Sequence, residues 1–296
     1  MTAKRRRLPS LFFRLPHEVL ERLFTFFPNV EDLINLSICS KEYNEFLKPY
    51  VYNCVCLSWG DLTKLEKDEL VGIDTLKPFV ECLKIEEFDI RKEWSFNYVV
   101  LNKQFENLKS LKMRISNSSN FLKYLQDDGL KLDELELINM NKESNLFNID
   151  HLRKIKVKSL KLNGFLIDFE EFDDMITHLE LINCYWNYPF ELDQFTKLIE
   201  LTLNYSNEFI ISERFRGFLM NPMLSNLEIL KIINNNSNLK LYIPAKLIQI
   251  ISAKIPTLQK VQLSGNVITS PSPKPSNTHN VRVVVDHQYI HSVLET

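Results

Sequence analysis

The strongest constraint on the fold of this chain is a short leucine pattern that recurs through most of its length. Eight segments fit L-x-x-L-x-L, with valine or isoleucine in place of some leucines. The segments begin at Val80, Leu108, Leu132, Val157, Ile176, Leu198, Leu227 and Leu258, at intervals of 19 to 31 residues. Such a period indicates a repeat architecture, in which each unit buries its apolar side chains only by stacking on its neighbours.

The spacing within each unit predicts a β-strand. The apolar fourth and sixth positions are separated by a polar residue, as Leu160 and Leu162 are by Lys161, and this period of two is typical of a strand with one buried face. Between the strands, residues 61–80 and 244–258 have the apolar spacing of helices. We therefore expect a stack of parallel strands with helices and loops covering their buried face.

This pattern resembles a leucine-rich repeat array over about residues 53–268, with about eight repeats. The resemblance implies a curved solenoid with the parallel β-sheet on its concave side and helices or loops on its convex side. The family favours asparagine or cysteine at the ninth position of each unit, which is Cys184 in one unit and Asn266 in another. We expect irregular turns where this residue is missing.

A solenoid of this kind would bind a partner through the outward-facing residues of its strands. Their charges are mixed, unlike those of a phosphate-binding groove, and aromatic residues follow several strands. Tyrosine and tryptophan dominate the hot spots of protein interfaces. The candidate substrate-binding residues are Lys161, His178, Glu180, Tyr185, Trp186, Tyr188, Tyr205 and Lys231.

Residues 11–52 form a separate helical segment in this prediction. The first helix begins at Leu15-Pro16 and should be stopped by Pro28. Asn29 is the expected N-cap of a second helix, and Ser40 that of a third, which Pro49 should end. Three short helices in about forty residues carry more apolar side chains than they can bury among themselves, so we expect them to meet a partner.

This segment resembles an F-box. The residues that match the family pattern are Leu15, Pro16, Glu18, Val19, Leu20, Leu23, Phe24, Asp32, Leu33, Leu36, Cys39, Ser40, Lys41 and Tyr43. Tyr43 stands where the family commonly has tryptophan, and "FFPNVEDL" departs from the usual join between the first two helices. The two resemblances together imply an α/β protein with an N-terminal three-helix F-box followed by an irregular leucine-rich repeat solenoid.

The order of these parts is that of F-box proteins with leucine-rich repeats, and it implies a function. The F-box would bind a Skp-family adaptor and, through it, a cullin and a RING protein, while the repeats hold a protein substrate for ubiquitination. The chain itself would not be an enzyme, because it acts by raising the local concentration of substrate near the activated ubiquitin. The adaptor-binding residues would be Leu15, Pro16, Val19, Leu20, Leu23, Phe24, Leu33, Leu36 and Tyr43.

Two other functions stay open at this point. An F-box protein can use the adaptor as a structural part of another assembly, such as a kinetochore or trafficking complex, without ubiquitination. A plain repeat scaffold is the third class, with residues 1–52 serving only to cap the array, but a mere cap would not need the Leu15-Pro16 entry and the three-helix pattern.

Composition argues against several other classes. The net charge of −2 gives no basic footprint for nucleic acid, and no apolar run reaches the length of a membrane span. The six histidines are scattered, and we expect no metal site and no cofactor. The five cysteines form no CxxC pair, so we expect buried, reduced thiols in a cytoplasmic or nuclear protein.

The ends of the chain complete the predicted organisation. Residues 1–10 read as a basic disordered tail, in which Lys4–Arg7 could serve as a nuclear import signal. Residues 269–280 are rich in proline and serine and should form a loop. Residues 281–296 should supply a strand or helix that caps the last repeat.

Overall fold

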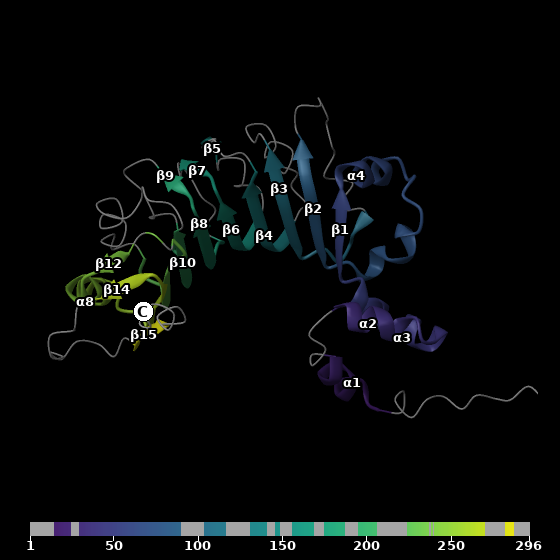
Figure 1. Cartoon of the computed structure of the whole chain (residues 1–296), viewed down its shortest axis with the longest axis horizontal. Helices are drawn as coiled ribbons and strands as arrows, with labels where there is room; N and C mark the ends of the chain where they lie inside the picture. The colour runs from purple at the N-terminus through teal and green to yellow at the C-terminus, as the bar shows by residue number, and fades with distance from the viewer. Residues whose placement is uncertain are drawn as a thin grey trace, which may run out of the picture.

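The computed structural model describes residues 15–24, 30–89, 104–116, 131–140, 146–148, 156–168, 175–186, 195–205, 224–236, 238, 240–269 and 282–286. These residues form a parallel-sheet solenoid that follows three short helices in the chain (Figure 1). The expected repeat solenoid is therefore confirmed. The basic tail, Pro28, Asn29, Tyr188 and the loop at 270–280 lie outside the described residues.

The main sheet has ten strands in the described part of the chain, and they lie side by side in chain order (Figure 1). Each strand pairs with its neighbours in parallel. The strands are β1 (Cys54–Ser58), β2 (Cys82–Asp89), β3 (Ser110–Ser116), β4 (Lys131–Asn139), β6 (Lys156–Asn163), β8 (His178–Ile182), β10 (Glu200–Tyr205), β11 (Ile229–Asn234), β13 (Lys260–Gly265) and β15 (Arg282–Asp286).

The leucine pattern accounts for the core. The register places the fourth positions of successive units opposite one another, and the sixth positions likewise; Leu135, Leu160 and Leu179 are one such row. All sixteen side chains at these two positions are buried, and so are the eight at the first position. Stacked in rows, they form one continuous apolar cluster along the solenoid.

In several units, the buried pattern begins three residues before the first position of the leucine pattern. Phe105, Phe195, Leu224 and Ile255 lie three residues before the first position of their units, and all four side chains are buried. In each case the backbone N–H of the first-position residue donates to the carbonyl oxygen of this earlier residue, at 3.1 to 3.2 Å. This tight turn brings the chain into its strand.

In the part of the chain that the structure describes, helices cover the solenoid near its two ends. Helix α4 (Trp59–Glu66) and the 3-10 turns η2 (Ile73–Thr75) and η3 (Lys77–Phe79) lie between β1 and β2, and α8 (Ala245–Lys254) lies between β11 and β13. Both regions with helical spacing thus contain helices, as expected. A capping box begins α4, because Ser58 and Asp61 each accept a hydrogen bond from the other's backbone N–H.

In the middle of the solenoid, short strands replace helices in the described residues. A second parallel sheet contains β5 (Leu146–Asn148), β7 (Leu166–Asp168) and β9 (Tyr185–Trp186). A third sheet, near the C-terminal end of the solenoid, pairs β12 (Leu241–Ile243) with β14 (Val267–Thr269) (Figure 1). The units that begin at Val157 and Ile176, 19 and 22 residues long, are the two shortest of the pattern.

Three strands, β6, β8 and β13, end at a turn at the eighth position of their unit. Gly164, Asn183 and Gly265 stand there with φ of 79°, 50° and 75°, in the left-handed region that glycine and asparagine tolerate best. Asparagine side chains at the eighth position reach the next unit: Asn139 Nδ2 donates to Gly164 O at 2.8 Å. The expectation that a ninth-position residue defines the turn was therefore incomplete, and Asn235 also occupies a ninth position.

The N-terminal helices are α1 (His17–Phe24), α2 (Val30–Ser37) and α3 (Lys41–Val51). Ser40 caps α3 as expected, because its Oγ accepts the Tyr43 backbone N–H at 3.1 Å. The prediction that Pro49 ends α3 was wrong, since the helix continues to Val51. Pro49 lies in the last turn, where the fixed φ of proline suits a helix and only one backbone hydrogen bond is lost.

Candidate protein-binding surfaces

Five of the described residues at the N-terminal helices are apolar and exposed. They are Leu15, Val19, Val30, Ile34 and Ile38, which are 38 to 74% exposed. Val30, Ile34 and Ile38 are spaced four residues apart, so they follow one face of α2 and the turn after it. We call these five residues the helical apolar surface. Isolated exposed apolar residues are ordinary, so the row of Val30, Ile34 and Ile38 along one face makes these residues a candidate site and not an established one.

The helices have a small core of their own. Leu20, Leu33, Leu47 and Val51 are buried together, with Leu36, Tyr43, Phe46, Tyr50 and Tyr52 packed partly against them. This cluster is distinct from the core of the solenoid. The apolar surface of the helices is therefore what remains after their own core is filled.

The residues expected to bind an adaptor divide between these two environments. Leu15, Pro16 and Val19 are exposed. Leu20 and Leu33 are buried in the helical core, whereas Leu23, Leu36 and Tyr43 are half-buried and the Phe24 side chain lies outside the description. Val30, Ile34 and Ile38 were missing from the expected set, although their spacing of four residues could have revealed them.

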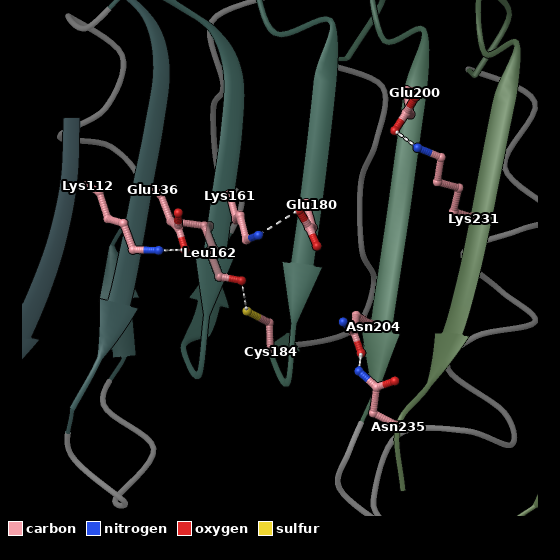
Figure 2. Close-up of polar contacts among 10 residues, drawn as sticks. All are labelled: Lys112, Glu136, Lys161, Leu162, Glu180, Cys184, Glu200, Asn204, Lys231 and Asn235. Carbon is pink, nitrogen blue, oxygen red and sulfur yellow. Dashed lines mark hydrogen bonds and ion pairs between the residues drawn. The ribbon is translucent and has the colours of Figure 1, made fainter. Parts of the chain in front are cut away.

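Ion pairs run across the outward face of the main sheet. Lys112 Nζ lies 2.9 Å from Glu136 Oε1, and Lys161 Nζ lies 3.1 Å from Glu180 Oε2 (Figure 2). Lys231 Nζ lies 2.5 Å from Glu200 Oε1 in the same view. Lys161, Glu180 and Lys231, expected to bind substrate, thus pair within the sheet. Partly exposed pairs of this kind contribute about 0.2–1 kcal/mol each, so a partner could displace them.

The other predicted substrate-binding residues are only partly described. The exposed His178 begins β8, with its Nδ1 at 2.8 Å from Thr177 Oγ1. The backbones of Tyr185 and Trp186 form β9, and Tyr205 ends β10. The side chains of these three aromatic residues lie outside the description, as does all of Tyr188.

A row of isoleucine and asparagine residues crosses the outward face of the main sheet at the seventh positions of the units, two residues after the ion pairs. The register aligns Ile138, Asn163, Ile182, Asn204 and Ile233, and all five are half-buried. Asn235 Nδ2 donates to Asn204 Oδ1 at 3.0 Å (Figure 2). Aligning the seventh positions of the units would have revealed this row, which makes the outward face less polar than its charges suggested.

Three cysteines gather at the β1 end of the sheet. Cys54 and Cys82 are directly opposite in the register of β1 and β2, with their Sγ atoms 3.0 Å apart, and Cys56 is exposed on the same face. The expectation of buried thiols was wrong for Cys39 and Cys56, which are exposed. Alternation along a strand places Cys54 and Cys56 on one face, away from the buried leucines.

The surroundings of three thiols, Cys56, Cys82 and Cys184, raise their pKa values. Burial is the main reason that the pKa of Cys82 rises to about 11, helped by its hydrogen bond with Cys54. Burial and the nearby Glu86 carboxylate raise the pKa of Cys56. Cys184 is buried in the core of the solenoid, and this burial raises its pKa to about 12. Its Sγ donates a hydrogen bond to Leu162 O at 3.3 Å (Figure 2). All three stay protonated at neutral pH.

A groove of about 720 Å³ lies where the helices meet the solenoid. Its lining includes Phe46 and Tyr50 of α3 and Phe79 of η3. Glu45 and Glu81 also line the groove, so its lining combines aromatic and acidic side chains. Each carboxylate pairs with a lysine, Glu45 with Lys48 at 2.8 Å and Glu81 with Lys109 at 2.7 Å.

Signs of other kinds of site are missing from the described residues. No group of three or more histidine, cysteine, aspartate or glutamate side chains there is arranged to hold a metal ion. Nor does any helix in that part of the chain combine the length and the apolar character needed to span a membrane.

Comparisons with known proteins add no identification. The chain matches no protein-family model, and a search of curated proteins gives no match. The function is therefore inferred from the geometry and the residues of the chain alone.

Proposed function

We propose that this protein is the substrate-recognition subunit of an SCF-type ubiquitin ligase. The helices α1 to α3 would act as an F-box that binds a Skp-family adaptor, and the solenoid would act as leucine-rich repeats that bind a protein substrate. Through the adaptor, the protein would join a cullin and a RING protein in the cytoplasm or the nucleus.

One observation carries this proposal: a helical unit with its own core leaves an apolar surface exposed directly beside a repeat solenoid. Only Tyr52 and Asn53 separate α3 from β1. The Asn53 carbonyl oxygen accepts the backbone N–H groups of Glu81 and Cys82, at 2.9 and 2.8 Å. These bonds support a short and ordered junction, suited to holding a substrate at a set position relative to the adaptor.

The outward face of the sheet supports the second half of the proposal. It offers exchangeable ion pairs beside half-buried isoleucines, such as Lys161–Glu180 beside Ile182. Interfaces combine an apolar centre with polar groups that give specificity. No catalytic role is proposed, because a receptor of this kind acts by positioning.

Co-purification with a Skp-family adaptor and a cullin tests the proposal. The double variant Leu15→Ser, Val19→Ser removes two exposed apolar side chains and leaves the helical core intact. The matched control is Val71→Ser, Tyr242→Ser, which changes two exposed apolar residues elsewhere. We expect the wild type and the control to retain both partners and the test variant to lose both.

The other functions predict different results. Retention of the adaptor without the cullin would favour a non-ligase assembly that contains the adaptor. Loss of both partners from the wild type would favour a plain repeat scaffold and would overturn the proposal.

A further inference from the structure

The thiols of Cys54 and Cys82 have a geometry that other cysteines in the described residues lack. They are direct partners across two parallel strands, and their Sγ atoms are 3.0 Å apart. Neighbouring strands lie about 4.8 Å apart, inside the range of about 4.4–6.8 Å between the Cα atoms of a disulfide. A disulfide would require the sulfur atoms to approach by only about 1 Å, because the bond length is about 2.05 Å.

Access to the pair is open. Both side chains are partly exposed, on the outward face of the sheet rather than in the apolar core. Of the remaining cysteines, Cys184 is buried and Cys39 lies on α2's C-terminal turn with its Sγ donating to Asn35 O. Cys56 is opposite Lys84 in the register, so it faces no cysteine.

We propose that Cys54 and Cys82 form a dithiol site that a small-molecule disulfide, such as glutathione disulfide, converts into an intramolecular disulfide. The Cys54 thiolate attacks one sulfur of the oxidant, the oxidant's S–S bond breaks, and one glutathione thiolate leaves. Cys82 then loses its proton and attacks the Cys54 sulfur, and the second glutathione leaves. The two cysteines are oxidised by two electrons, and their protons end on the two glutathione thiolates.

The order of these steps follows from the surroundings of Cys82. Burial raises the pKa of Cys82 to about 11, which lowers its thiolate fraction and disfavours it as the first nucleophile. Cys82 needs to act only within the mixed disulfide, where its high local concentration compensates for its low thiolate fraction.

The new bond would change the junction between the helices and the solenoid. It would close a loop of 28 residues that contains α4, η2 and η3. It would also bind β1, the strand that follows α3, covalently to β2. We expect oxidation to stabilise this junction against unfolding, because the cross-link restricts the unfolded chain.

Oxidation of the full-length protein with glutathione disulfide tests the proposal. Peptide mapping after alkylation of the remaining thiols should show a Cys54–Cys82 cross-linked peptide, and dithiothreitol should remove it. The variant Cys56→Ser should still form the cross-link, whereas Cys54→Ser should not. A Cys54–Cys56 bond, or a mixed disulfide that persists on Cys54, would overturn the proposal.

A second measurement needs no variant and is independent of the adaptor proposal. Phenylarsine oxide bridges two neighbouring thiols and should bind the native reduced protein with one-to-one stoichiometry, protecting Cys54 and Cys82 together from alkylation. Protection of neither thiol, or of only one, would show that the pair does not act as a dithiol.

Discussion

Gly265 lies against the backbone of Asn234 in the adjacent turn of the solenoid. A Cβ at position 265 would be 2.3 Å from the Asn234 carbonyl oxygen, and Gly265 has a φ of 75°. The same oxygen accepts the backbone N–H of Asn266 at 2.9 Å. Close packing and an unusual backbone conformation therefore meet at one residue.

The substitution Gly265→Ala should lower the free energy of unfolding by more than about 2 kcal/mol. The left-handed conformation alone costs about 1–2 kcal/mol for a residue with a Cβ, and the Asn234 carbonyl must also move. Gly72→Ala is the matched control, because Gly72 has a φ of 83° with open space around its Cβ position. Urea unfolding should show the larger loss for Gly265→Ala; equal losses would contradict this account.

The buried Cys184 should make stability depend on alkaline pH. Its pKa is raised from 9.0 to about 12 in the folded protein, so the unfolded chain loses this proton first as the pH rises. The resulting stabilisation is complete below pH 9 and is lost as the pH rises toward 12. The stability difference between the wild type and Cys184→Ala should fall by about 1.4 kcal/mol from pH 8 to pH 10. A constant difference would refute the prediction.

The Lys161–Glu180 ion pair should contribute little energy on its own. Both side chains are about 30% exposed, which allows water to screen the charges. A double-mutant cycle with alanine should give a coupling energy of about 0.2–1 kcal/mol, which decreases at high salt. Lys161 and Gln262, which lie several strands apart, should show additive effects within about 0.5 kcal/mol. A coupling above 2 kcal/mol would mean that the pair is a structural part of the sheet.

Loss of the Leu47 side chain should affect the helices more than the solenoid. Leu47 is fully buried in the helical core, and Leu→Ala at such a site costs about 2–5 kcal/mol. Ile38→Ala is the control, because Ile38 is 74% exposed and its loss should cost less than about 0.5 kcal/mol. Hydrogen exchange should show faster exchange in α2 and α3 of Leu47→Ala, with β6 unchanged. Equal acceleration in β6 would show that the two cores unfold together.

Much of the solenoid follows from local patterns. The period of two in each unit determines which residues are buried, and the recurrence of the units determines that they stack in parallel, so the rows through Leu135 and Leu160 were predictable. The unit that contains β1 did not match the leucine pattern, because Tyr52 stands at the first position of this unit, where the other units have leucine, valine or isoleucine. Its buried Leu57 nevertheless aligns with Ile85 of β2.

Other features depend on neighbours that are distant in sequence. The pairing of Lys161 with Glu180 depends on the register between β6 and β8, which is visible only after the fifth positions of the units are aligned. The proximity of Cys54 and Cys82 needs the same alignment between two units of which only one matched the leucine pattern. On the helices, position in the sequence could not separate the buried Leu20 from the exposed Val19, since both lie on a broad apolar face.

The unequal lengths of the units have a consequence for how this protein can change through insertion and deletion. Intervals of 19 to 31 residues are accommodated beside strands whose fourth and sixth positions stay aligned along the main sheet. Residues gained or lost between strands therefore alter one side of the solenoid and leave the other side in place. A single residue gained between the fourth and sixth positions of a strand would instead turn a buried side chain outward. Strand β2 accommodates a register shift against β3, and this shift lies after its buried Ile85.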